Sequence, residues 1–170
     1  MSFRVLADGR IKFSILTTKP ANPAAPTITE LNAGIDMSCK VTQDGFSFGP
    51  TDSDKVQEKA LCTVNNANSL GPSNAEVAFN VWRFFDEAGF DATDDAGFDA
   101  VKDKGTTLWA YARQTEKLAT AAWAAADEIY FGAEFVTDTP QRVDTGGFIK
   151  YRIPGEVQNS WSFVAAAAGA

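Results

Sequence analysis

The sequence predicts an all-β domain, a sandwich or half-barrel of about seven or eight strands with one short helix packed on it. Apolar and polar residues alternate in several short segments, most clearly from Asp127 to Val136, as strands with one buried face require. Stretches rich in Gly, Pro, Asn and Ser separate these segments and are typical of turns. The strongest helix signals lie in residues 93–104.

Length and charge indicate one soluble globular unit. A chain of 170 residues is expected to form a single domain, 1–170, which buries about 70% of its unfolded surface without disulfides or metal. No apolar run approaches the roughly 18 residues of a membrane span, so we expect synthesis in the cytoplasm and no membrane partner. Most of the net charge of −7 comes from residues 86–104, and no basic patch for nucleic-acid binding is present.

The N-terminal elements follow from alternation, proline and capping signals. Residues 10–18 alternate and predict a first strand. Three prolines make residues 19–27 an extended connector. Thr27 and Glu30 have capping-box spacing, which predicts a one-turn helix that ends at Gly34 in the left-handed conformation.

Two strands with a long connection are expected next. Residues 35–41 alternate, and β character resumes in residues 56–65 after the long loop 43–55. Cys39 and Cys62 lie on these two strands and could face each other. Because a cytosolic protein is expected, two reduced, buried thiols are favoured over a disulfide.

The middle of the chain alternates between loops and strands. Residues 65–74 have loop chemistry, and 75–85 carry aromatics on both faces, as a central strand does. Residues 106–113 and 127–136 predict two further strands. The alanines of 115–126 favour helix by propensity, but a loop or the start of a strand is the preferred interpretation.

The acidic segment is interpreted as a surface helix rather than a calcium loop. Thr93 is placed to cap a helix over 93–104, with acidic residues in its first turn and Gly105 after its end. An EF-hand needs Gly and Glu where this chain has Ala96 and Lys102.

The C-terminal part predicts a hairpin and a tail. Residues 144–147 form a hairpin-type turn that leads into a strand over 148–153, and a last strand covers 160–164. The Ala-rich residues 165–170 are expected to be flexible.

No motif for chemistry is present. The chain has no histidine, which excludes histidine-dependent serine and cysteine triads, and we expect no enzymatic activity, no cofactor and no metal site. The turn at 144–147 is not expected to bind phosphate, because no helix start follows it. Acidic residues on polar strand faces are interpreted as solvated rather than catalytic, and the four tryptophans as core or interface residues rather than as platforms for sugars or bases.

Four sequence segments resemble the major tail tube proteins of long-tailed, siphovirus-type phages, particularly those of actinobacteria. These are PTITELNAGIDMSCKV, EKALC, DEIYFGAEFVTDTPQ and GGFIKY, which span most of the chain. The resemblance implies a structural virion protein, assembled in the host cytoplasm, whose hexameric rings stack into the tail tube that conducts the genome. It also implies that the partners are further copies of the chain, the tape measure, tail terminator and distal tail proteins, and double-stranded DNA in passive passage.

Two sets of residues are expected to serve this assembly. The loop 43–55 is longer than an isolated domain needs, so its apolar side chains are candidate contacts to another subunit: Phe46, Phe48 and Pro50. A lumen that is neutral to acidic on balance would leave DNA mobile. The candidate lumen carboxylates are Asp36, Glu58, Glu128 and Glu134.

Two alternatives remain at this point. A monomeric carbohydrate-binding β-sandwich would use surface aromatics on a flat face. The tube protein of a contractile secretion system would share the fold of a phage tube protein.

Overall fold

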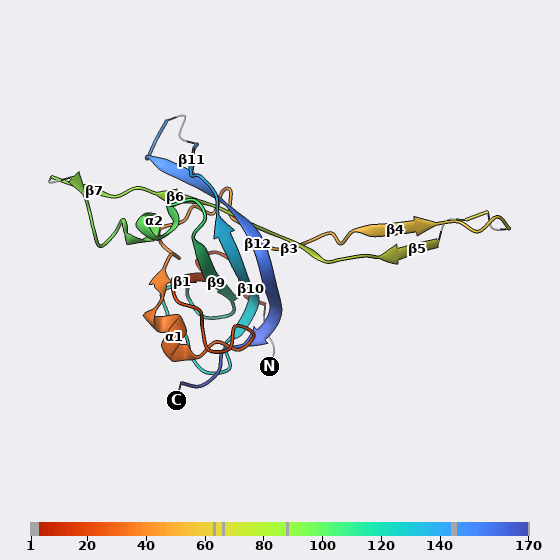
Figure 1. The fold of residues 1–170 in the computed structure, drawn as a ribbon. Coiled ribbons are helices and arrows are strands. Elements are labelled where there is room, and N and C mark those ends of the chain that lie inside the picture. Colours follow the sequence, from red (N-terminus) through yellow and green to blue (C-terminus); the bar gives the residue numbers. More distant parts are fainter. Residues whose placement is uncertain (1–3, 63, 66, 88, 144–145, 170) are drawn as a thin grey trace.

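The computed structural model describes residues 4–62, 64–65, 67–87, 89–143 and 146–169. Most strands of the described chain belong to one antiparallel sheet (Figure 1). Its strands lie in the order β2 (Ile35–Asp36), β1 (Ile11–Leu16), β9 (Thr107–Gln114), β10 (Glu128–Thr137), β12 (Lys150–Ala165), β6 (Asn74–Trp82) and β3 (Ser47–Thr51), and β11 (Gln141–Arg142) also pairs with β12. The predicted all-β class is confirmed.

The sheet curls until its two ends meet. Phe13 of β1 lies near one end of the strand order, yet its ring centroid is 5.0 Å from that of Phe48 in β3 at the other end. The chain that follows β2 crosses to the far edge, where Val41 forms a bridge with Val81 of β6. Residues 37–42 therefore close one side of a half-barrel.

The inside of this half-barrel is the main core. It is aromatic and aliphatic, as the alternating strands predict, and its largest fully buried members include Phe13, Phe79, Phe131, Phe135 and Ile153. Edge-to-face contacts join several of these rings, for example Phe79 and Phe135 at 6.5 Å. Such pairs stabilise the core by about 0.5–1.5 kcal/mol beyond their buried area.

A second apolar cluster covers the other face of β9. Trp109 and Tyr111 project from this face and pack with Leu31 of α1 (Ile28–Ala33) and with Trp123. The capping box of α1 is present, since Thr27 accepts from the Glu30 amide and Glu30 from the Thr27 amide. The left-handed C-cap is wrong, because Gly34 is extended with φ −69°.

The strand predicted over 35–41 is wrong beyond Asp36. The Asp36 carboxylate accepts a hydrogen bond from the Ser38 amide, which turns the chain out of the strand direction. Met37 is fully buried below α2 (Ala96–Val101), where a Cβ on Gly97 would stand 2.3 Å from its Sδ. A local side-chain hydrogen bond and a tertiary contact thus override the alternating pattern.

The acidic helix is shorter than predicted. It covers 96–101 rather than 93–104, and Thr93 is not its cap, because the Asp91 carboxylate accepts from the Thr93 and Asp94 amides in a preceding turn. Asp95 stands at the N-cap position, but its carboxylate accepts a hydrogen bond from Arg83 and none from the backbone amides of the helix.

The two strands predicted over 148–153 and 160–164 form one continuous strand. β12 runs without interruption from 150 to 165, with an irregularity in its register with β10 between Glu134 and Phe135. Asp144 and Thr145 of the predicted turn lie outside the described residues. The C-terminal alanines differ from the flexible tail that was expected, because Ala166 is buried and Ala167 exchanges backbone hydrogen bonds with Pro26 and Ile28. Residues 115–126 form a loop rather than the helix that their alanines favour by propensity.

Candidate assembly surfaces

The most conspicuous surface feature is a long hairpin, residues 52–73, which we call the arm. It projects from the body as β4 (Lys55–Glu58) and β5 (Ala67–Leu70) (Figure 1). The arm continues the β3–β6 ladder, whose last register pair is Thr51 and Asn74. Every residue of β4 and β5 is exposed, so the arm makes no core of its own.

Polar contacts fix the base of the arm. Backbone hydrogen bonds join Asp54 to Gly71 and to Pro72, and the Asn74 amide group donates to the Asp54 carboxylate. At about 3.3 Å per residue, the chain from Thr51 to Leu61 carries the end of the arm roughly 30 Å from the sheet.

The end of the arm is apolar and almost uncharged. We define the arm tip as Lys59–Cys62 and Val64. Leu61 is 109% exposed and Val64 is 88% exposed, and no charged residue follows Lys59 before Glu76. Exposed aliphatic side chains at the end of a long projecting hairpin are typical of a surface that another chain covers.

The sequence-based contact residues lie elsewhere. Phe48 is 7% exposed inside the half-barrel, and Phe46 packs against the same cluster, 5.1 Å from the Phe13 ring. Their assignment as inter-subunit anchors is corrected, because both rings pack in the core of their own protomer: Phe48 on β3, which pairs with β6, and Phe46 just before β3. Pro50 is exposed on β3, opposite Ala75.

The arm also replaces the strand expected over 56–65. Strand β4 pairs with β5 rather than with residues 35–41, so Cys39 and Cys62 do not face each other across two strands. Both thiols are free and exposed rather than buried.

The four candidate lumen carboxylates are not brought together. Asp36 is on the short edge strand β2 and pairs with Lys12 at 2.7 Å. Burial tends to raise the pKa of Asp36, but hydrogen bonds from Lys12 and Ser38 outweigh it and hold the pKa below its usual value. Glu58 is on the arm, and only Glu128 and Glu134 share a strand, β10.

A second surface suited to assembly is an open sheet edge. Strand β6 pairs with one edge of β12, but only along Lys150–Gly155. Beyond that point, no strand in the described part of the chain pairs with this edge of β12 from Glu156 to Ala165. An unpaired edge of this length is a template for a strand of another chain.

A smaller hairpin, β7 (Phe85–Asp86) with β8 (Gly89–Phe90), extends β6 at its other end. Arg83 holds it in place, because its guanidinium lies 3.8 Å from the Phe98 ring centroid and 4.7 Å from that of Phe90. The carboxylate of Asp95 accepts hydrogen bonds from Arg83 Nε and Nη2 at 2.8–3.1 Å. No sequence pattern indicates this cluster, which joins β6, the hairpin and α2.

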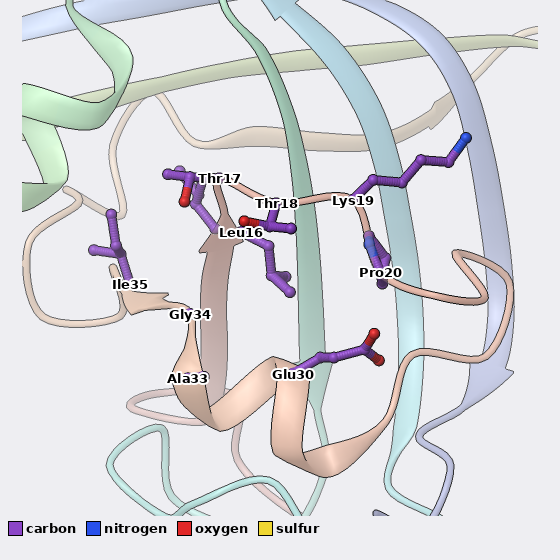
Figure 2. A pocket seen from close by; sticks show the side chains of 10 residues that line it. Leu16, Thr17, Thr18, Lys19, Pro20, Glu30, Ala33, Gly34 and Ile35 are labelled. Carbon is purple, nitrogen blue, oxygen red and sulfur yellow. The ribbon is translucent and has the colours of Figure 1, made fainter.

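A shallow cavity of about 210 Å³ lies between β1, residues 17–20 and α1 (Figure 2). Glu30 extends from α1 toward Pro20, while the Lys19 side chain points away (Figure 2). The Glu30 carboxylate accepts hydrogen bonds from the backbone amides of Ala21 and Thr27, which hold its pKa below the usual value. This carboxylate is therefore a structural acceptor and not a free acid or base.

Among the described residues, no three Cys, Asp or Glu side chains are grouped so that they could hold a metal ion. Within the same residues, no helix has the length and apolar character to cross a membrane.

The chain matches a known protein family. A search of curated proteins finds no match. The family model described as phage tail tube protein matches residues 1–170, the whole chain. A half-barrel with an exposed arm and an open sheet edge suits a subunit that associates with copies of itself. The chain therefore belongs to the phage tail tube protein family and is a structural component of the virion tail.

Proposed function

We propose that this protein assembles into hexameric rings that stack into the tail tube, the conduit for genome delivery. The observation that carries the proposal is the arm, which reaches roughly 30 Å from the sheet and makes no core of its own. An element of this length that buries nothing in its own protomer gains stability only by contact with another chain.

The open edge of β12 supplies the contact within a ring. A strand of the next protomer that pairs with residues 156–165 satisfies backbone groups and removes a template for uncontrolled aggregation. Repeating the same heterologous contact around an axis closes a ring. The arm then joins one ring to the next.

The lumen is assigned to the β10 surface that carries Glu128 and Glu134. Duplex DNA carries one negative charge per about 1.7 Å, so a basic bore would bind it through many contacts and retain it. A neutral to acidic bore leaves the genome mobile, and the protein acts through geometry rather than catalysis. The other proposed partners of the tube are the tape measure, tail terminator and distal tail proteins. Assembly takes place in the host cytoplasm.

One deletion tests the role of the arm. Because Thr51 and Asn74 are register partners, an Asn-Gly turn can join them directly in place of residues 52–73. We expect the deletion variant to keep the melting temperature of the wild-type monomer within a few degrees and to form no tubes by negative-stain microscopy. Normal tubes from this variant would contradict the proposal.

Gel filtration and negative-stain microscopy of the wild-type chain discriminate the alternatives. Stacked rings at high protein concentration are expected for a tube protein. A monomer that binds polysaccharide resins and never forms rings would identify the carbohydrate-binding module. Location of the gene among phage tail genes or secretion genes separates a tail tube from a secretion tube.

A further inference from the structure

A cavity of about 500 Å³ opens at one end of the half-barrel, and we call it the barrel mouth. Its floor is the main core itself, since Phe13 and Met37 are 1% and 0% exposed and both line it. Ile11, Val41 and Phe46 add apolar walls. This size lies in the range in which proteins bury a ligand group.

We propose that the barrel mouth of one protomer receives the arm tip of a second copy, an inference that rests on the proposed tube assembly. The tip offers Leu61 and Val64, which are almost fully exposed in the isolated chain. Apolar side chains that enter an apolar cavity are removed from water, which favours the contact. The receptor and the inserted group thus match in polarity.

The charges match as well. Lys59 is the single charged residue of the arm tip, and Asp8 is the single charged residue that lines the barrel mouth. A lysine stem packs along an apolar wall while its ammonium reaches a carboxylate at the rim. The N-terminal segment of a second copy also carries a basic residue, Arg4, beside exposed Val5 and Leu6. The arm tip is favoured over it because Leu6 leads directly into Ala7 and Asp8, which line the mouth of their own protomer.

The contact is between chains and not within one. The arm leaves the sheet at Thr51 and Asn74 and points away from the body (Figure 1). Phe46, which lines the mouth, precedes β3, whereas the arm follows the other end of that strand. The tip of the same protomer is therefore directed away from its own mouth.

The two native cysteines report on this contact. Cys39 lines the barrel mouth, and Cys62 belongs to the arm tip. A Cys62→Ser chain keeps one thiol at the mouth, and a Cys39→Ser chain keeps one thiol at the tip. The two chains are assembled together and separately, then treated with a short bismaleimide and analysed by denaturing electrophoresis and peptide mass spectrometry.

The proposal expects cross-linked dimers joined through Cys39 and Cys62 in the mixed tubes and none in either chain alone. Leu61→Asp is expected to reduce the yield at least tenfold. Asp8→Lys is expected to reduce it as well, and Lys59→Glu in the partner chain to restore it. Rescue by charge exchange is not expected from a variant that merely misfolds.

Three outcomes overturn the proposal. Dimers within the Cys39→Ser chain alone would show that arm tips meet one another. A Leu6→Cys chain in which both native cysteines are replaced by serine can be mixed with the Cys62→Ser chain. Linkage of its new thiol to Cys39 would identify the N-terminal segment as the occupant. Tubes that form normally but give no Cys39–Cys62 linkage would refute the receptor while leaving the tube function intact, whereas absence of tubes would count against both.

Discussion

Arg113 and Asp127 form a buried ion pair in which Nη1 lies 2.6 Å from Oδ2, with side chains 0% and 5% exposed. The same guanidinium donates to the carbonyls of Leu118, Ala121 and Ala122. Lys117 also pairs with Asp127. One buried cation thus holds the loop that covers the second apolar cluster.

Asp127→Asn is expected to lower the free energy of unfolding by about 3–5 kcal/mol, because it leaves the Arg113 charge buried without its counter-ion. Asp99→Asn is the matched control, since Asp99 pairs with Lys102 on the surface, and its cost is expected to stay below about 1 kcal/mol. Urea denaturation of the monomer at neutral pH measures both. Equal effects of the two substitutions would contradict the assigned role of the pair.

The same pair predicts a pH dependence. Burial tends to raise the pKa of Asp127, but hydrogen bonds from Lys117, the Ala124 amide and Arg113 outweigh it and leave the pKa below its usual value. The contribution of the ionised Asp127 to the free energy of unfolding is therefore complete above its unfolded-state pKa of about 4. This contribution is lost as the pH falls through the lower folded-state pKa. The difference in unfolding free energy between wild type and Asp127→Asn should shrink in denaturation series below pH 4. A difference that grows on acidification would reverse the sign assigned to this group.

Gly132→Ala is expected to destabilise the protomer by about 1–3 kcal/mol, because the new methyl group overpacks a filled site. A Cβ there would stand 2.6 Å from Cδ1 of Tyr111, its register partner in β9. Gly49→Ala in β3 meets no atom within 4 Å and serves as the control. Thermal unfolding should show a lower melting temperature for the first variant only, and a neutral Gly132→Ala would mean that Tyr111 moves without cost.

Phe48→Ala is expected to reduce monomer stability by about 3–5 kcal/mol, as truncation of a buried aromatic ring does. Phe48 contacts the Phe13 and Phe131 rings at 5.0 and 4.9 Å. Phe85→Ala, at a ring 51% exposed, is the comparison and should cost far less. Guanidinium denaturation of both monomers decides, and an unchanged midpoint for Phe48→Ala would restore the ring to the list of inter-subunit anchors.

Charge reversal tests the lumen assignment. Tubes carrying Glu128→Lys and Glu134→Lys are expected to retain double-stranded DNA at low salt and to release it as salt rises, because lysines displace counter-ions from the phosphates. Glu58→Lys adds a charge on the arm and should leave DNA retention unchanged. Filter binding of assembled tubes over a salt series measures this, and equal retention by the two sets would place Glu128 and Glu134 outside the lumen.

The sequence by itself determined the fold class and the main strands. Strong alternation in residues 10–18, 106–113 and 127–136 predicts β1, β9 and β10, because a strand with one buried face imposes a period of two on its own residues. The capping box of Thr27 and Glu30 was equally readable, since both partners lie within one turn of chain.

Tertiary structure decided the features that depend on distant partners. The Phe48 ring turns inward because β3 pairs with β6, and the residues after Asp36 leave the strand because Met37 packs under Gly97. The arm has the same β pattern as a sheet strand, but it projects because the β3–β6 ladder continues past the edge of the body. Alternation reports which residues share a face of a strand, and only the partners of that strand decide whether the face meets the core, solvent or another subunit.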